Sequence, residues 1–443
     1  MANSETRRRI AVFGAGYLGA THAACMAELG HDVIGVDVDP ERIRTLQEGK
    51  VPFYEPGLDE LIARHTATGR LRFTASYDEA AAQADVHFIG VGTPQRADSG
   101  AADLSQIDAV IDALAPLLTD GSVVLGKSTV PVGTADYIAG RVRELAPGRD
   151  VAVGWNPEFL REGTAVEDTL RPDRVVVGAS ADDADRVSAA ARDVYARPLA
   201  EGTPFLETDL ATAELVKVSA NSFLATKLSF INAVSEVCDL VGADVTMLAV
   251  ALGLDERIGK SYLQAGVGYG GACLPKDVRA FHARAAELGA RGIPDLLGGV
   301  DRINALQRSR VTDLVAQACP EGGTVAMLGL AFKADSDDVR DSAALDVASR
   351  LIAQGRTVRA WDPQANANAA RVQPALRLAA SAEEACRSAD VVVVMTPWDE
   401  IRELDPAELA SIVGTRSVID ARNCLDPAAW TAAGWTYRGI GRS

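Results

Sequence analysis

A glycine-rich run at residues 14–19 constrains the fold of this chain more than any other feature. The run, GAGYLG, follows the short apolar stretch Arg9–Phe13 and leads directly into Ala20–Leu29, which has small residues at helical spacing. A strand, a glycine turn and a helix in this order are typical of a βαβ unit, because glycine allows the tight turn and close packing of helix on strand. We therefore predict a parallel α/β domain in this part of the chain.

The same run predicts a dinucleotide site. Amide groups at the start of a helix attract phosphate, and glycines let a pyrophosphate approach the backbone closely. A second predicted strand, Asp32–Val36, ends in Asp37, where a carboxylate accepts hydrogen bonds from an adenosine ribose. We expect NAD to be preferred to NADP, because a 2′-phosphate would meet an uncompensated carboxylate. The cofactor residues predicted from this motif are Gly14, Gly16, Tyr17, Leu18, Gly19 and Asp37.

The strand pattern of the first part of the chain recurs in the last part. Three strand-like segments appear twice in the same order, and the pairs are residues 30–37 with 355–362, 84–94 with 389–397, and 122–125 with 417–419. Helical stretches separate the strands in both copies. The sequence therefore predicts two doubly wound, Rossmann-like parallel-sheet domains whose ligands bind at the carboxyl ends of the strands.

The second copy differs from the first in its opening turn. Its first predicted strand, Thr324–Leu328, is followed by GLAFKAD at residues 329–335, which lacks the third glycine and contains Lys333. A lysine suits a different phosphate-bearing ligand, held partly by a point charge. One domain would then bind NAD and the other the nucleotide of a substrate. A purely structural duplicate is the alternative.

A helical region lies between the two predicted domains. Asp209–Val241 contains no glycine or proline and is predicted to form a long helix that joins the domains. Lys217 and Asn221 share one face of this helix, one turn apart, which suggests a joint task, although a solvated pair is the alternative. We predict an α/β fold with an NAD-binding domain over 1–205, a central helical region over 206–310 and a domain for the substrate nucleotide over 311–443.

Cys273 lies in the run GYGGACLPKD at residues 268–277, which indicates a nucleophile. The glycines let the backbone approach a ligand, and Lys276 favours the thiolate, the reactive form of cysteine. The alternative is an inert thiol buried in a tight turn.

Composition indicates the class of protein. A chain of 443 residues needs more than one core, and a formal net charge of −17 argues against nucleic acid or an anionic membrane as a partner. The six cysteines form no CxxC pair and no apolar run reaches the length of a membrane span, so we expect a cytoplasmic enzyme without a metal site or a disulfide framework. The polar stretch Met1–Arg9 is expected to be a solvated tail.

Three motifs together identify a resemblance to a known family. They are GAGYLG at residues 14–19, NPEFLREG at 156–163 and GGACLPKD at 270–277. Supporting runs lie at residues 91–94, 127–133, 255–259 and 332–340. With these motifs the chain resembles the UDP-glucose/GDP-mannose dehydrogenase family from about Arg9 to about Tyr437.

The resemblance implies the oxidation of the C6 alcohol of UDP-glucose to the carboxylate of UDP-glucuronate, with two NAD⁺ and one water. Cys273 would hold the intermediate aldehyde as a thiohemiacetal and then as a thioester. The catalytic residues implied are Cys273, Lys217 and Asn221 for oxyanions at C6, Asp277 and Thr129 for orienting water, and Glu158 as a general base.

Binding residues are also implied by the resemblance. The further NAD contacts implied are Arg42, Thr93, Thr129, Glu162, Lys276 and Arg340. The substrate contacts implied are Glu158, Phe159, Leu160, Arg161, Glu162, Lys217, Asn221, Tyr262, Gly270, Lys333, Arg422 and, from a second subunit, Arg257. A residue supplied by a second subunit implies a homo-oligomer that is at least a dimer.

The chain departs from the family pattern at three positions. Ala272 and Leu274 replace a Ser and a Phe common in UDP-glucose enzymes, and Asp341 replaces a Glu. Leu274 also occurs in GDP-mannose relatives, so GDP-mannose and UDP-N-acetylmannosamine remain alternative substrates. A two-electron 3-hydroxyacid dehydrogenase and a non-catalytic NAD sensor are further alternatives, but neither would use the thiol of Cys273.

Overall fold

The computed structural model describes residues 7–96 and 98–442, and within them the chain folds into two compact units. The first unit ends at Ala220 and the second starts at Asn221. Helix α10 (Leu210–Val241) therefore contributes its first turns to one unit and the rest to the other. Its limits confirm the long helix predicted from the stretch without glycine or proline.

A sheet with the strand order β3-β2-β1-β4-β5-β6-β7-β8 forms the centre of the first unit. The strands are β1 (Arg9–Phe13), β2 (Asp32–Val36), β3 (Leu71–Thr74), β4 (Val86–Ile89), β5 (Val123–Gly126), β6 (Ala152–Trp155), β7 (Val175–Ala179) and β8 (Phe205–Thr208). The order from β3 to β6 is that of a doubly wound dinucleotide-binding sheet, as predicted. One pair departs from the prediction: β7 follows only the short helix α7 and runs antiparallel to β6.

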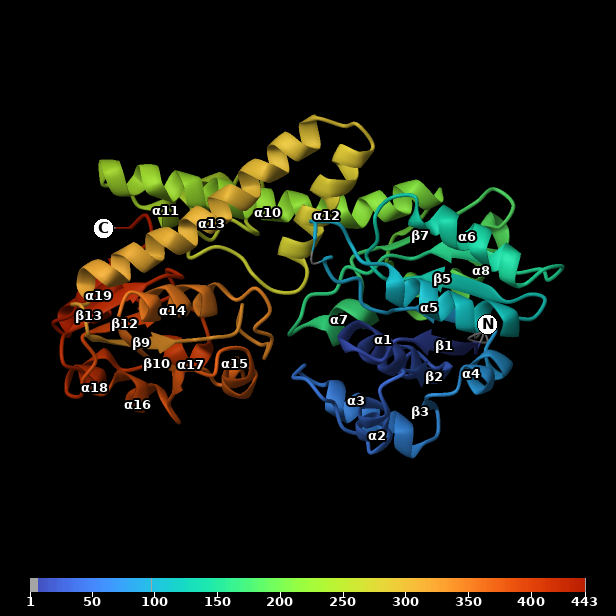
Figure 1. Ribbon diagram of the computed structural model, residues 1–443, viewed down its shortest axis with the longest axis horizontal. Coiled ribbons are helices and arrows are strands. Elements are labelled where there is room, and N and C mark those ends of the chain that lie inside the picture. The colour runs from blue at the N-terminus through green and yellow to red at the C-terminus, as the bar shows by residue number, and fades with distance from the viewer. Residues whose placement is uncertain (1–6, 97, 443) are drawn as a thin grey trace. The chain divides into compact units, whose positions relative to one another are not determined.

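Helices cover both faces of this sheet (Figure 1). They are α1 (Tyr17–Glu28), α2 (Pro40–Gln47), α3 (Leu58–Ala67), α4 (Tyr77–Gln83), α5 (Ser105–Leu114), the 3-10 turn η1 (Ala115–Leu117), α6 (Thr134–Leu145), α7 (Ala165–Leu170), α8 (Ala184–Val194) and α9 (Ala196–Ala200). Because side chains alternate along a strand, Ile10 and Val12 of β1 pack in one core and Ala11 and Phe13 in the other. Burial on both faces explains the uninterrupted apolar strand sequences.

The second unit contains a parallel sheet in the order β11-β10-β9-β12-β13-β14. The strands are β9 (Thr324–Leu328), β10 (Thr357–Trp361), β11 (Arg377–Leu378), β12 (Val391–Val394), β13 (Ser417–Asp420) and β14 (Thr436–Gly439). The helices are α11 (Val245–Gly253), α12 (Leu274–Glu287), α13 (Gly292–Ala318), α14 (Ala343–Ala353), α15 (Asn366–Val372), α16 (Ala382–Cys386), α17 (Asp399–Arg402), α18 (Pro406–Ala410) and α19 (Pro427–Ala432). The strand order confirms the repeated α/β fold.

The repeat extends to one carboxylate in each unit. Asp37, after β2, accepts a 2.8 Å hydrogen bond from the amide of Ala15. Asp362, after β10, accepts bonds of 2.6 and 2.9 Å from the amides of Leu330 and Ala331. In both copies an acid at the end of the second strand fixes the turn that follows the first strand.

The structure corrects the expectation of a solvated tail over Met1–Arg9. Residues 1–6 of that stretch lie outside the described residues. Arg9 is the first residue of β1, Arg8 forms an ion pair with Asp193 at 2.5 Å, and Arg7 pairs with Asp32. The arginine cluster therefore forms part of the folded unit, because acidic side chains near β1 offer it partners. In the described part of the chain, no helix is long and apolar enough to cross a membrane.

Candidate active site

The glycine run lies between β1 and α1, and its glycines meet distinct steric requirements. Gly14 has φ +94, which side chains disfavour. A Cβ at Gly19 would lie 1.7 Å from the carbonyl oxygen of Gly14, whereas one at Gly16 would meet nothing within 4 Å. Gly19 therefore permits close packing, and Gly16 leaves the loop open at the start of α1. This geometry fits the pyrophosphate of a dinucleotide.

Asp37 is buried and paired with Arg42. A guanidinium nitrogen of Arg42 lies 3.1 and 3.0 Å from the two carboxylate oxygens of Asp37. The amide of Asp39 donates a further bond of 3.0 Å. The expectation of an uncompensated carboxylate is therefore wrong, because Arg42 from α2 balances its charge.

Two further predicted cofactor residues meet at the carboxyl ends of β4 and β5. The hydroxyl of Thr93 donates a 2.7 Å hydrogen bond to the carbonyl oxygen of Thr129. Ser128 also connects these two loops, because its hydroxyl donates a 2.6 Å hydrogen bond to the carbonyl oxygen of Val91. The structure thus joins the two loops in the region where doubly wound sheets bind ligands.

The segment after β6 contains a buried ion pair. Lys217, which is 4% exposed, holds its ammonium 2.9 Å from Glu158 Oε1. The other oxygen of Glu158 accepts a 2.5 Å bond from the amide of Leu160. Phe159 stacks against Arg174, whose guanidinium carbon lies 3.8 Å from the ring centroid. Two of the predicted catalytic groups, Glu158 and Lys217, are therefore in contact.

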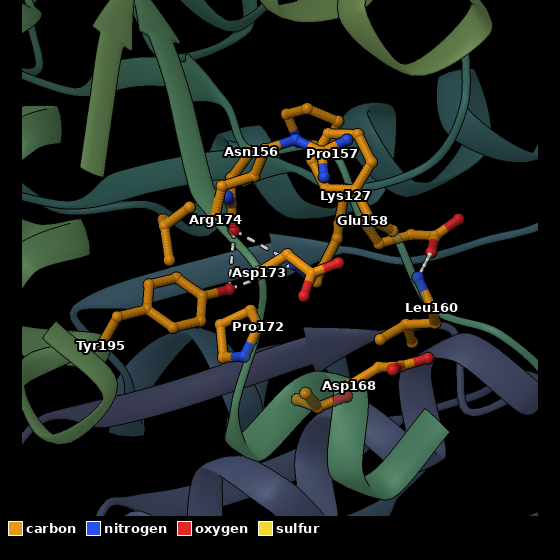
Figure 2. A pocket seen from close by; sticks show the side chains of 13 residues that line it. Lys127, Asn156, Pro157, Glu158, Leu160, Asp168, Pro172, Asp173, Arg174 and Tyr195 are labelled. Carbon is orange, nitrogen blue, oxygen red and sulfur yellow. Dashed lines mark hydrogen bonds between the residues drawn. The ribbon is translucent and has the colours of Figure 1, made fainter. Parts of the chain in front are cut away.

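The pocket in Figure 2 lies beside this ion pair and contains polar residues that sequence reasoning missed. The ammonium of Lys127 donates bonds of 3.1 Å to Asn156 Oδ1 and to the hydroxyl of Tyr195. Burial lowers the pKa of Lys127 to about 8. A lysine directly after the apolar strand β5 was a signal that could have identified it, whereas nothing in the sequence marked Tyr195.

Cys273 is exposed and immediately precedes the first turn of α12. Gly268 and Gly271 have φ values of +100 and +87, so the approach to the cysteine needs glycine at both positions. A Cβ at Gly268 would lie 2.4 Å from Asn304 Oδ1, which accepts a bond from the amide of Tyr269. The loop is therefore fixed in position, and Cys273 lies at the start of α12, where the helix amides carry partial positive charge.

Three more predicted residues form a polar cluster in the second unit. Asn221 Nδ2 donates a 2.6 Å hydrogen bond to Asp277 Oδ2, and Lys276 Nζ lies 2.5 Å from Asp277 Oδ1. Asp277 is 1% exposed, and its amide donates to the carbonyl of Cys273. Asn221 and Lys276 therefore bind opposite oxygens of the same buried carboxylate.

All six cysteines lie within the described residues, and Cys273 is the exposed one. Burial raises the pKa of Cys25 and of Cys386 to about 12. For Cys424, the competitor in the last part of the chain, burial and the carboxylate of Asp420 raise the pKa to about 12. The surroundings of these thiols oppose the thiolate form.

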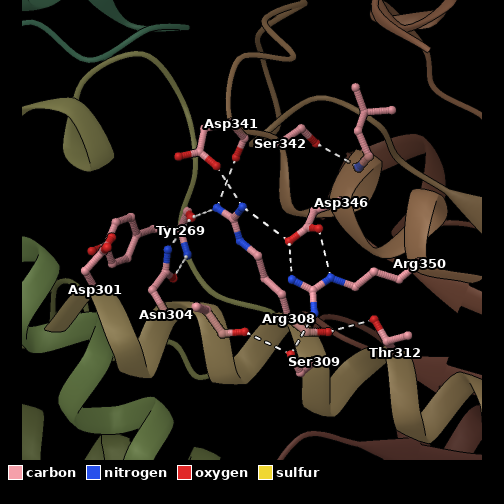
Figure 3. A network of polar contacts seen from close by, with 12 residues as sticks. Tyr269, Asp301, Asn304, Arg308, Ser309, Thr312, Asp341, Ser342, Asp346 and Arg350 are labelled. Carbon is pink, nitrogen blue, oxygen red and sulfur yellow. Dashed lines mark hydrogen bonds and ion pairs between the residues drawn. The ribbon is translucent and has the colours of Figure 1, made fainter. Parts of the chain in front are cut away.

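A buried network ties the loop before Cys273 to the turn after β9 (Figure 3). Arg308 on α13 donates hydrogen bonds of 2.8 Å to the carbonyl oxygen of Tyr269 and of 2.7 Å to Asp341 Oδ1. The amide of Gly271 donates 2.9 Å to the carbonyl of Arg340. Arg308 therefore positions both Tyr269 and Asp341.

The two predicted phosphate-binding cations differ in their surroundings. Arg422 donates to the carbonyls of Gly268, Met395 and Phe332, at 2.9, 2.7 and 3.3 Å. Burial lowers the pKa of Arg422 to about 10. The ammonium of Lys333 lies 5.9 Å from the ring centroid of Phe332.

The remaining predicted site residues make contacts of their own. Arg161 pairs with Asp168, and Arg340 pairs with Asp338 at 2.7 Å. Tyr262 has φ +64, and Gly270 is buried. Burial, with smaller effects from Glu55 and Glu162, raises the pKa of the Tyr17 hydroxyl. The side chain of Arg257 is 88% exposed and pairs with Asp255.

Family profiles match three successive parts of the chain. Profiles of the UDP-glucose/GDP-mannose dehydrogenase family match residues 8–198 as the NAD-binding domain, 211–306 as the central domain and 326–427 as the UDP-binding domain.

Related proteins cover nearly the whole chain. The UDP-glucose 6-dehydrogenase of Rhizobium meliloti (strain 1021) is 42% identical over 98% of this chain and 99% of its own length. The UDP-glucose 6-dehydrogenase YwqF of Bacillus subtilis (strain 168) is 40% identical over 98% of this chain and 97% of its own length. A solved UDP-glucose dehydrogenase from Pyrobaculum islandicum superposes with a TM-score of 0.91 at 35% identity, covering 100% of both chains. The chain belongs to the UDP-glucose/GDP-mannose dehydrogenase family and is an NAD-dependent oxidoreductase.

Proposed function

We propose that this chain oxidises the C6 alcohol of UDP-glucose to the carboxylate of UDP-glucuronate through a covalent intermediate on Cys273. The observation that carries the proposal is the position of Cys273, the exposed cysteine among six, at the start of α12. The names of the relatives support UDP-glucose as the substrate, and the match to a UDP-binding domain supports a UDP-sugar.

The chemistry balances with one thiol and one water. NAD⁺ supplies the oxidant, accepting one hydride in each of two steps. Loss of a hydride and a proton from the alcohol gives an aldehyde, to which the sulfur of Cys273 adds to form a thiohemiacetal. Loss of a second hydride and proton gives a thioester. Water then adds, the carbon–sulfur bond breaks, and the carboxylate, a proton and the free thiol of Cys273 are released.

The polar pairs supply the remaining groups. Lys217 carries a buried positive charge suited to stabilising an oxyanion at C6, and Asn221 can donate to the same oxygen. Glu158 is the proposed base for the attacking water, and Asp277 and Thr129 orient that water. Covalent capture on Cys273 keeps the reactive aldehyde from being released.

Binding roles are proposed for the other predicted residues. In addition to the glycine run and Asp37, NAD would contact Arg42, Thr93, Thr129, Glu162, Lys276 and Arg340. The sugar nucleotide would contact Phe159, Leu160, Arg161, Glu162, Tyr262, Gly270, Lys333 and Arg422. We keep the division into an NAD-binding part (1–205), a central part (206–310) and a part for the substrate nucleotide (311–443) as a proposal.

We also propose a homo-oligomer that is at least a dimer. The second unit exposes apolar side chains at heptad spacing on α10, with Phe223 65%, Phe230 55% and Val237 56% exposed. Such a face is typical of a helix that packs against a partner. Phe230→Glu should give monomers in light scattering. Loss of activity on dissociation would support the role proposed for Arg257 in a second subunit.

The NADH yield tests the proposed reaction. Two NADH per UDP-glucose, with UDP-glucuronate as the product, are expected; one NADH would indicate a two-electron dehydrogenase, and none would contradict the assignment. GDP-mannose and UDP-N-acetylmannosamine are the alternative substrates to assay in parallel. The acidic composition and the absence of paired cysteine motifs in the sequence support a cytoplasmic location, which we propose as well.

A further inference from the structure

Glu55 is a buried carboxylate that none of the sequence motifs assigns to a task. It lies between α2 and α3 and is 4% exposed. Its Oε2 accepts a 2.6 Å bond from the amide of Gly163, and its Oε1 accepts 2.7 Å from the amide of Ala165. The hydroxyl of Tyr17 donates to Oε2 as well. One side chain thus binds donors from two distant loops.

The first of these loops is the glycine run. Tyr17 is the first residue of α1, next to Gly16, whose surroundings are open. The ring of Tyr17 also packs against Phe53, with 5.0 Å between centroids, so the segment that carries Glu55 contacts Tyr17 twice. A shift of the glycine run on binding a pyrophosphate must therefore move Tyr17 against Glu55.

The second loop is the segment 158–165, which carries Glu158 at one end and the amides held by Glu55 at the other. Its helix α7 also contacts α1, where the thiol of Cys25 lies 3.8 Å from the carbonyl of Val166. Contacts between α1 and α7 therefore add to the link that Glu55 makes between Tyr17 and this segment.

The three donors to Glu55 are a phenol and two amides, and none carries a charge. Hydrogen bonds to a charged acceptor are stronger than those between neutral groups, and bonds that share an acceptor influence one another. Loss or displacement of the phenol therefore alters how firmly Glu55 holds Gly163 and Ala165.

We propose that Glu55 is a positioning residue that transmits occupancy of the glycine run, through Tyr17, to the segment 158–165. Cofactor binding would thereby order the segment that begins with the proposed base, Glu158. This effect of cofactor binding on the segment 158–165 requires only NAD. Its effect on binding of the sugar nucleotide rests on the proposed function.

Hydrogen–deuterium exchange tests the transmission with NADH as the ligand and the full chain. In the unmodified protein, NADH should slow exchange of the peptide covering residues 158–165 by about threefold or more, because Gly163 and Ala165 donate to Glu55. In Tyr17→Phe, which keeps the ring but removes the donor, the slowing should fall to less than half. Glu55→Gln should lose it, since an NH2 group replaces one of the two carboxylate oxygens and cannot accept the bond from Gly163 or from Ala165.

The control is Glu48→Gln, which changes an exposed glutamate paired with Lys50 in the same unit. It should keep the full effect of NADH. Absence of slowing in the unmodified protein, or equal slowing in Tyr17→Phe and Glu55→Gln, would overturn the proposal, because NADH would then act on the segment directly or not at all. Thermal unfolding of each variant identifies a general loss of structure, and Tyr17→Phe remains informative if Glu55→Gln fails to fold.

A kinetic comparison extends the test to the sugar nucleotide. Tyr17→Phe should raise the KM for UDP-glucose by about threefold at saturating NAD, since the segment is then ordered less well. If the unmodified protein does not oxidise UDP-glucose, the proposed function fails while the exchange experiment still decides the role of Glu55.

Discussion

Asn221 donates a hydrogen bond of 2.6 Å to Asp277, one helical turn beyond Cys273 in the chain. The other oxygen of Asp277 lies 2.5 Å from the ammonium of Lys276. An acid with both oxygens bound has a fixed orientation, as a group that directs water must have. The geometry therefore links the long helix α10 to α12, which starts directly after Cys273, through one buried carboxylate.

Asp277→Asn should lower kcat by about 100-fold, because an amide placed against Asn221 and Lys276 sets donor against donor. It should also reduce the free energy of unfolding by about 1–3 kcal/mol. Steady-state kinetics and urea denaturation measure the two effects. Asp295→Asn, at an exposed position of α13, is the matched control and should change neither. An Asp277→Asn enzyme with unchanged kcat would remove this carboxylate from the mechanism.

Cofactor preference should respond in opposite directions to changes at Asp37 and Arg42. Arg42→Ala exposes the carboxylate of Asp37 and should increase the preference for NAD over NADP by about tenfold, consistent with about 1–3 kcal/mol for a phosphate near an uncompensated charge. Asp37→Ser should narrow the preference. The ratio of kcat/KM for the two cofactors is the measurement, and a shift in the same direction for both variants would contradict the pairing.

The sequence predicted features whose cause is local. The glycine run, the acid after β2, the second set of strands and the helix α10 each follow from short-range requirements of turn, burial or propensity. The glycines in the loop before Cys273 could also be recognised from the sequence as structurally required, because two of them occupy left-handed conformations that other residues avoid.

Features that depend on distant contacts could not be predicted. Glu55 binds Tyr17, Gly163 and Ala165 across 38, 108 and 110 residues of chain. Such contacts are set by tertiary packing, which no motif encodes.

Two buried histidines should make stability depend on pH. Burial lowers the pKa of His87 to about 4 and also lowers that of His22. Both are uncharged in the folded state, whereas the unfolded chain gains protons below about pH 6.5, so stability is present above that pH and is lost as the pH falls towards 4. The loss attributable to His87 is about 3 kcal/mol.

His87→Leu should therefore flatten the decline in the free energy of unfolding between about pH 6.5 and about pH 4.5, measured by urea denaturation. His282→Gln, in the second unit, is the control and should leave the decline as it is. An identical pH dependence in His87→Leu and the unmodified protein would contradict the assignment.

Alkylation should identify the reactive thiol. Iodoacetamide at about pH 7.5 should modify Cys273 at least about tenfold faster than any other cysteine, because Cys273 is exposed and the surroundings of Cys424 oppose its thiolate. Peptide mapping after brief treatment measures the order of labelling. Faster labelling of Cys424 would mean that the local surroundings of the two thiols have been misjudged.

The most direct test of the covalent mechanism is mass spectrometry of the products formed by Cys273→Ala and Cys424→Ala from UDP-glucose and NAD⁺. Cys273→Ala should form less than about 1% of the unmodified enzyme's UDP-glucuronate while its Kd for NADH and for UDP-glucose changes by less than about threefold. Cys424→Ala should form the acid at close to the unmodified rate. Abundant UDP-glucuronate from Cys273→Ala, or none from a folded Cys424→Ala, would show that Cys273 is not the nucleophile.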